Sequence, residues 1–206
     1  MRTDAEKEKE KALTSDILTL TREARSVRVF GQEKCATVAE LRYFVDCARL
    51  TPSAANAQIL KYKICADKKT VDALFPLTRW AGYIKDRKLP PEGKEPTSYI
   101  VICHDKTCGT MTAFGQMDVG IAAQTINLAA REAGFAVCMI GSFDKEALTK
   151  LLGFDESIEP VLVIAVGEAA EAPEICHVGD DGSIKYFRDA DDKHFVPKRS
   201  MEDILL

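Results

Sequence analysis

Two pairs of cationic side chains stand near opposite ends of the chain and could hold one phosphate group. The first pair is Arg25 and Arg28, and the second is Lys198 and Arg199. A guanidinium matches a phosphate with two parallel N–H groups, and Ser26 adds a hydroxyl donor. Because the net charge of the chain is −4, one anion bound from both ends would explain two basic pairs in an acidic protein. Taken singly, each pair is more often a solvated turn or a charged tail.

The segment from Pro52 to Gln58 combines small residues with two amide side chains. Small residues such as Ser53 and Ala54 would let the backbone approach a flat ring. Asn56 and Gln58 can each donate and accept hydrogen bonds, which suits the mixed edge of a pyrimidine-like ring. The alternative is a turn in which Pro52 ends a helix and Asn56 caps the turn.

A glycine turn, Ile140-Gly141-Ser142-Phe143-Asp144, joins an expected strand to an expected helix. Because glycine has no Cβ, the main-chain N–H of Gly141 could reach a ligand closely. The same five residues also suit a plain strand-to-helix turn, and Asp144 is the expected helix cap in either case.

About five strands and five or six helices are expected to position these segments. Apolar residues that recur every three or four positions predict helices, and short apolar or alternating runs predict strands. The predicted helices cover residues 14–25, 37–50, 68–75, 117–134 and 145–152. The predicted strands cover residues 59–66, 99–104, 136–140, 160–167 and 184–187. The intermixed order predicts a layered α+β or α/β domain.

The length of 206 residues suits one domain with a full core. We expect a charged N-terminal extension over residues 1–13 and a single domain over residues 14–206. Residues 80–98 are rich in charge and proline and predict a long loop. Loops of this length in compact domains are often lids or binding segments.

Composition and missing motifs exclude several classes of function. An acidic chain argues against a nucleic-acid partner, and no uninterrupted apolar run reaches the ~18 residues of a membrane span. No secretory or transit signal precedes the domain, so we expect a cytoplasmic location. The seven cysteines show no CxxC spacing, which predicts reduced structural thiols and no metal site. Dinucleotide, P-loop and serine-hydrolase motifs are absent from the sequence.

The four segments, in this order and at these separations, resemble the nitroreductase-like family of FMN-dependent NAD(P)H oxidoreductases. The run Asp118-x-Gly120-x-Ala122-x-Gln124 and the strand near residues 161–167 add to the resemblance. It implies an α+β fold, a nitroreductase-like three-layer sandwich in which helices flank a central, mainly antiparallel sheet. It also implies an intertwined homodimer with two FMN sites at the subunit interface.

The resemblance also implies roles for particular residues. Arg25, Ser26, Lys198 and Arg199 would hold the phosphate, and Arg28 would lie near the ribityl chain and the N1/O2 edge. The flavin ring would be met by Ile140, by Gly141 through its backbone N–H to N5, and by a segment of the partner chain. That segment consists of Pro52, Ser53, Ala54 and Asn56.

The implied activity passes hydride from NAD(P)H through flavin N5 to an electron-poor acceptor, a nitroaromatic or a quinone, by ping-pong chemistry. It needs no catalytic side chain. Two positions depart from the family pattern: Ala24 replaces a basic residue, and Ile59-Leu60 replaces Pro-Trp. Two alternatives remain at this point, a non-catalytic FMN-binding or flavin-storage protein and a dimeric scaffold without cofactor.

Overall fold

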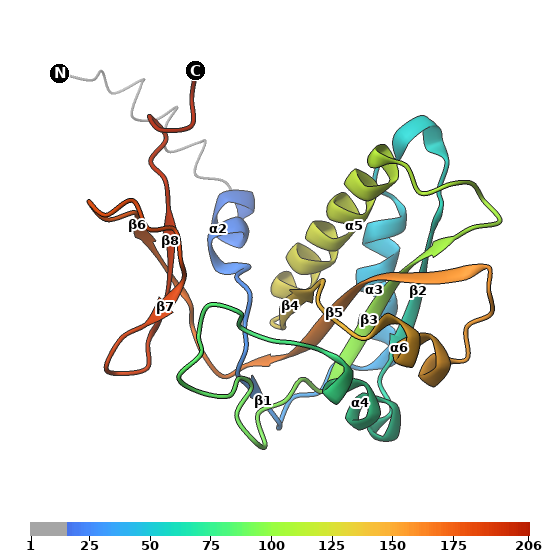
Figure 1. The fold of residues 1–206 in the computed structure, drawn as a ribbon, viewed down its shortest axis with the longest axis horizontal. Helices are drawn as coiled ribbons and strands as arrows, with labels where there is room; N and C mark the ends of the chain where they lie inside the picture. Colours follow the sequence, from blue (N-terminus) through green and yellow to red (C-terminus); the bar gives the residue numbers. More distant parts are fainter. Residues whose placement is uncertain (1–15) are drawn as a thin grey trace.

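The computed structural model describes residues 16–206, so the predicted extension over residues 1–13 lies outside the described residues. The described chain intermixes helices with two β-sheets (Figure 1). The helices are α2 (Asp16–Glu23), α3 (Val38–Arg49), α4 (Lys68–Leu74), α5 (Ala113–Glu132) and α6 (Lys145–Leu152), with short 3-10 turns η1 (Ala54–Asn56) and η2 (Phe75–Leu77). The strands are β1 (Phe30–Gly31), β2 (Leu60–Cys65), β3 (Ser98–Asp105), β4 (Ala136–Ile140), β5 (Ile158–Ala169), β6 (Glu174–His177), β7 (Phe187–Arg188) and β8 (His194–Lys198).

The long strand β5 organises the main sheet. It pairs with β3 along one edge and with β4 and β1 along the other, and β2 completes the sheet beyond β3. Every pairing between these five strands is antiparallel. The register places Ile100 opposite Ile164 and Cys138 opposite Ala165. Successive side chains of a strand point to opposite faces, so both faces of this sheet need a cover.

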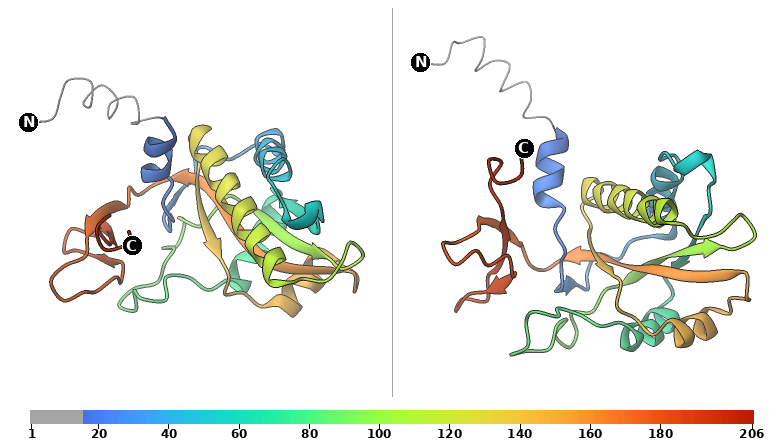
Figure 2. Two further views of the ribbon diagram at one scale, coloured as in Figure 1. Left: turned by 90° about the horizontal axis from the view of Figure 1, so that it is seen from above. Right: turned by 45° about the horizontal axis from the view of Figure 1, so that its top comes forward.

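Helices cover both faces of the sheet. Ile100 and Ile164 pack with α3 and α5 in one apolar cluster. Val101 and Val163, their neighbours in sequence, pack with α4 and α6 in a second cluster. The right view of Figure 2 shows α3 and α5 on one side of the strands and α4 and α6 on the other. The predicted α+β architecture, with helices flanking an antiparallel sheet, is therefore confirmed.

The local sequence explains the two helices of the first layer. Thr37 caps α3: its hydroxyl accepts from the backbone N–H of Glu40, whose side chain accepts from the N–H of Thr37 in return. Buried alanines along α5 let it pack closely on α3 and the sheet, as the sequence predicted. The helix begins at Ala113 rather than at the predicted residue 117, because the Thr112 hydroxyl caps the N–H of Gly115.

The loop over residues 80–98 is confirmed, since no helix or strand interrupts residues 80–97. The predicted strand over residues 184–187 is confirmed only at Phe187, which begins β7, and residues 184–186 form no strand. The chain instead forms a separate sheet in the order β6-β8-β7, which stands beside α2 at one end of the molecule (Figure 1). We call residues 174–198, which contain this sheet, the C-terminal lobe. No helix within residues 16–206 has the length and apolarity needed to cross a membrane.

A tight contact at Gly167 of β5 gives a first prediction. A Cβ added there would lie 2.9 Å from Cδ1 of Phe30 and 3.4 Å from Oγ1 of Thr97, and Phe30 is fully buried. We expect Gly167→Ala to lower the free energy of unfolding by about 1–3 kcal/mol, the cost of overpacking. Urea unfolding measures the change. Gly82→Ala is the control, because nothing lies within 4 Å of a Cβ at that position. Equal stability of the two variants would contradict the prediction.

Candidate functional site

The first basic segment lies along the sheet next to β4. Ser26 forms a parallel bridge with Val137, and the N–H of Val27 donates to the Val137 carbonyl oxygen at 3.0 Å. Farther on, Phe30 pairs with Ala169 of β5. The backbone on either side of Arg28 is thereby fixed to the sheet, which determines where the cations of this segment stand.

Both chain ends line one cavity of about 360 Å³. Arg25, Ser26 and Arg28 enter from the first segment, and Lys198 enters from the end of β8. The other lining residues are Ala24, Gln124, Asn127, Val137, Met139, Tyr186 and Val196. Among residues 16–206 the lining thus includes three cations and no carboxylate, which is an arrangement suited to an anion. As predicted, the structure brings these four residues of the two chain ends to one cavity.

The guanidinium of Arg25 is partly buried, and its hydrogen-bonding capacity is not fully used. Burial lowers the pKa of its guanidinium, and its Nε is buried without a hydrogen-bond partner. Its Nη2 donates to the Thr21 carbonyl oxygen at 2.5 Å. Within residues 16–206, no carboxylate forms an ion pair with Arg25 or Lys198. A desolvated cation without a counter-charge favours binding of an anion.

Arg28 is buried between two rings of the C-terminal lobe. Its guanidinium carbon lies 4.3 Å from the centroid of the Tyr186 ring, and its Nη1 lies 3.4 Å from Nε2 of His194. A cation over an aromatic face is attracted by the ring quadrupole. The Nε of Arg28 is buried without a partner, so this residue retains one free donor beside the cavity.

A buried ionic cluster lies behind Arg28. The backbone N–H of Arg28 donates to one oxygen of Glu171, and the other oxygen pairs with Arg188. Nδ1 of His194 lies 3.6 Å from that second oxygen. Burial raises the pKa of Glu171, but the contacts with His194, the Arg28 N–H and Arg188 outweigh it, so the pKa lies below its ordinary value. Glu171 is therefore ionised at neutral pH.

The sequence did not single out this cluster or Asn127 of α5, which lines the cavity, and Gln124, which also lines it, was noted only as part of the run that resembles the family. Nδ2 of Asn127 donates to the Ala24 carbonyl oxygen at 3.2 Å and to Oε1 of Gln124 at 3.3 Å. One signal for these two residues was available in the sequence. They are two amides three positions apart in a helix that is otherwise rich in small apolar residues. For Glu171 and His194 no local pattern exists, because their partners are distant in sequence.

The structure places the segment after α3 at a different site. Pro52 and Ser53 line a separate cavity of about 140 Å³ together with Asp118 of α5. The N–H of Ala54 donates to both oxygens of Asp118, at 3.1 and 3.2 Å. Asn56 lies two residues farther on in η1. Within one chain, these four predicted residues are not brought to the cavity of Arg25.

The backbone of this segment is strained. Three non-glycine residues adopt left-handed conformations, with φ of 51° at Ala55, 53° at Asn56 and 48° at Gln58. Such conformations cost of order 1–3 kcal/mol each and tend to occur at functional sites. The cost is consistent with a segment shaped for a ligand or a partner chain.

The remaining predicted residues lie at the margins of the first cavity. Ile140, the last residue of β4, is buried in the second apolar cluster, and the preceding residue, Met139, lines the cavity. Gly141 is exposed, with open space where a Cβ would stand. Arg199 is exposed and follows Lys198, but it is not among the lining residues.

The cysteines are all unpaired. Cys65, Cys103 and Cys138 are buried in the second apolar cluster, and burial raises their pKa values to about 11, 12 and 11. Such thiols are inert at neutral pH, as predicted for structural cysteines. Cys35 and Cys108 are exposed, so the prediction of buried structural thiols does not extend to them.

Comparison with known proteins decides the family. The Nitroreductase family model matches residues 21–168. The chain belongs to this family. The match covers the first basic segment, the strained segment and the glycine turn, and it ends before the C-terminal lobe.

Individual relatives agree with this assignment. A protein of Methanothermobacter thermautotrophicus, provisionally named NADH dehydrogenase/NAD(P)H nitroreductase, is 23% identical over 162 residues, covering 77% of this chain and 80% of the relative. Among solved structures, a nitroreductase family protein of Clostridium difficile superposes with a TM-score of 0.62 at 18% identity, covering 76% of this chain and 86% of the other. A protein of Exiguobacterium sibiricum that is provisionally named a nitroreductase, solved in complex with FMN, gives a TM-score of 0.64 at 16% identity, covering 77% of this chain and 90% of the other. These likenesses confirm the fold.

Proposed function

We propose that the chain is an FMN-dependent oxidoreductase that uses NAD(P)H to reduce an electron-poor small molecule such as a nitroaromatic or a quinone. The observation that carries this proposal is the cavity in which Arg25, Arg28 and Lys198 meet without a lining carboxylate. Family membership supports the choice of FMN, and the name of the archaeal relative supports NAD(P)H. We also propose a cytoplasmic location, which is typical of the family.

The residues present fit the phosphate of FMN. The partly desolvated guanidinium of Arg25 has an unpartnered Nε, and a phosphate dianion would supply the missing acceptor. Ser26 and Lys198, on the same cavity, add a hydroxyl and an ammonium. Arg199 stands next to Lys198 at the exposed rim and would be the fourth phosphate contact.

The other cavity residues would orient and polarise the cofactor. Bound FMN supplies the redox chemistry, accepting hydride from NAD(P)H and passing it to the acceptor. Arg28, which contacts Tyr186 and His194, would stabilise the negative charge that develops near N1 and O2 of the reduced flavin. The N–H of Gly141 would donate to flavin N5, with Ile140 beside it. No side chain of this chain acts as a nucleophile.

The second segment reaches the ring only if a second copy of the chain supplies it. Asn127, on the first cavity, and Asp118, on the second, are about half a turn apart around α5 at 3.6 residues per turn. Phe114, Met117 and Ile121 form an apolar stripe on the Asp118 side and are 64%, 60% and 42% exposed. Exposed apolar stripes of this kind mark interfaces. We therefore propose a homodimer in which Pro52, Ser53, Ala54 and Asn56 of one copy cover the flavin held by the other.

The visible spectrum of the purified protein tests the function. We expect a yellow protein with flavin absorption, and anaerobic NADPH or NADH should bleach it rapidly in stopped flow. Rapid reoxidation by a quinone or a nitroaromatic should follow. A colourless protein that does not bind added FMN would contradict the proposal. A yellow protein that NAD(P)H reduces only negligibly would instead establish the flavin-storage alternative.

A further inference from the structure

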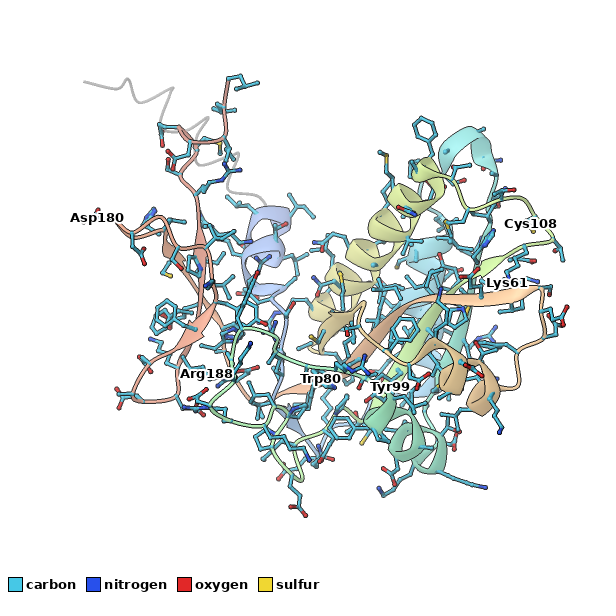
Figure 3. All side chains as sticks on the ribbon, in the orientation of Figure 1. Lys61, Trp80, Tyr99, Cys108, Asp180 and Arg188 are labelled. Carbon is cyan, nitrogen blue, oxygen red and sulfur yellow. The ribbon has the colours of Figure 1, made fainter. Side chains whose placement is uncertain are left out.

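The C-terminal lobe completes the cavity but contributes nothing to the apolar cores. Tyr186, Val196 and Lys198 of the lobe line the cavity. Neither of the two apolar clusters formed by the described residues includes a residue of the lobe. In Figure 3, Arg188 lies where the lobe faces the loop after Trp80, and Asp180 lies at the outer end of the lobe. The lobe must therefore be held to the rest of the molecule mainly by polar contacts.

Glu171 is the residue at which those polar contacts converge. It lies in the connection between β5 and β6, and its side chain is only 8% exposed. One oxygen accepts from the backbone N–H of Arg28, which belongs to the segment fixed along the sheet. The other oxygen faces Arg188 of β7 and His194 of β8. A single carboxylate thus joins the sheet edge to two strands of the lobe.

Two further contacts between the lobe and the loop over residues 80–97 are more exposed. The rings of Tyr83 and Tyr186 lie 5.2 Å apart, and Arg87 pairs with Asp192. Side chains of Arg87 and Asp192 are 38% and 58% exposed. Exposed ion pairs contribute little, whereas removing the charge from one partner of a buried pair is strongly destabilising. The buried attachment therefore consists of the Glu171 carboxylate and of the Arg28 side chain, which lies between Tyr186 and His194 of the lobe.

We propose that Glu171 is a positioning residue that docks the C-terminal lobe, so that Tyr186 and Lys198 close the cofactor cavity and lobe docking is coupled to FMN binding. This inference rests on the proposed function for the identity of the ligand. Docking of the lobe by Glu171 does not depend on the identity of the ligand. Coupling between two events is reciprocal: if docking favours FMN, then FMN must favour the docked lobe.

Two Glu-to-Gln variants, one at the buried carboxylate and one at an exposed carboxylate, distinguish docking of the lobe from a general effect of losing one negative charge. Glu171→Gln keeps the shape of the side chain but removes the carboxylate that His194 faces, and it leaves Arg188 with only the exposed Asp192 as a charged partner. Glu174→Gln is the matched control: Glu174 lies in the lobe, three residues on, in an exposed ion pair with Lys193 at 2.8 Å. Flavin-fluorescence quenching should show FMN affinity reduced by about 5- to 150-fold in the first variant, the usual range of a coupling. The control should change less than about twofold.

Hydrogen exchange supplies a readout that catalytic activity does not. In Glu171→Gln, backbone amides of residues 174–198 should exchange faster than in the wild type or the control, while β3 and β5 keep their protection. In the wild type, adding FMN should slow exchange in the lobe. Unchanged lobe exchange in Glu171→Gln, or an equal loss of protection throughout the sheet, would overturn the inference.

The outcomes also separate this inference from the proposed function. If the wild type does not bind FMN, the proposed function and the coupling fail together, and lobe exchange in the two variants without FMN still decides whether Glu171 docks the lobe. If the wild type binds FMN and Glu171→Gln binds it equally well, the inference fails and the proposed function survives.

Discussion

Replacing Arg25 and Lys198 together with alanine is expected to weaken FMN binding by more than either single replacement, each of which removes a charge-assisted contact worth about 1.5–3 kcal/mol. The two side chains come from opposite ends of the chain and line the same cavity. The phosphate dianion loses both charge-assisted contacts in the double variant. Fluorescence titration of each single variant and of the double variant measures the losses.

The complete double-mutant cycle makes this test sharper. If both cations hold one phosphate, the loss in the double variant should differ from the sum of the two single losses, because residues that share a partner are coupled. Arg22→Ala is the control, since Arg22 is exposed on α2 and does not line the cavity. Wild-type affinity in both single variants would mean that the phosphate binds elsewhere.

Phe44→Ala is expected to lower the free energy of unfolding by about 3–5 kcal/mol, the usual cost of emptying a buried aromatic site. Phe44 is fully buried in α3, and its ring lies edge-on to Phe135, with centroids 6.1 Å apart. The same apolar cluster includes residues of α5, β3 and β5, so removing the ring would leave a cavity bordered by several packed elements.

Chemical unfolding monitored by circular dichroism measures this loss. Arg42→Ala, on the exposed side of the same helix, should stay within about 0.5 kcal/mol of the wild type. A loss for Phe44→Ala as small as that for Arg42→Ala would show that α3 does not pack on the sheet as described.

Elements with strong local signals could be predicted from the sequence. The bounds of α6 were predicted correctly because Asp144 caps its start and Gly153, with φ of 67°, ends it. The bounds of β4 followed from a short apolar run after a glycine. The C-terminal lobe could not be predicted in the same way. Its strands β6 and β8 pair in parallel across a long stretch of sequence, and Ile184, which suggested a strand, is 65% exposed.

The residues of the candidate site also fall into two groups, those that could be predicted from the sequence and those that could not. Arg25, Ser26, Arg28 and Lys198 could be grouped because phosphate binding demands their chemistry, whatever the fold. Glu171, Tyr186 and His194 could not, because only the tertiary structure brings them to Arg28. The segment at Ser53 showed the right residue types, but one chain holds it on the far side of α5. The residue types do not show which copy of the chain would supply this segment, and only the family resemblance implied the partner chain.

The absence of lobe residues from both apolar clusters bears on how the protein is made. Chains grow from the N-terminus, and domains fold as their residues emerge. Both described clusters are complete once β5 has been synthesised, whereas Lys198 is added later. We therefore expect the sandwich to be able to fold before the lobe that closes the cavity has formed, so that binding of the prosthetic group is a late step of biogenesis rather than a prerequisite for it.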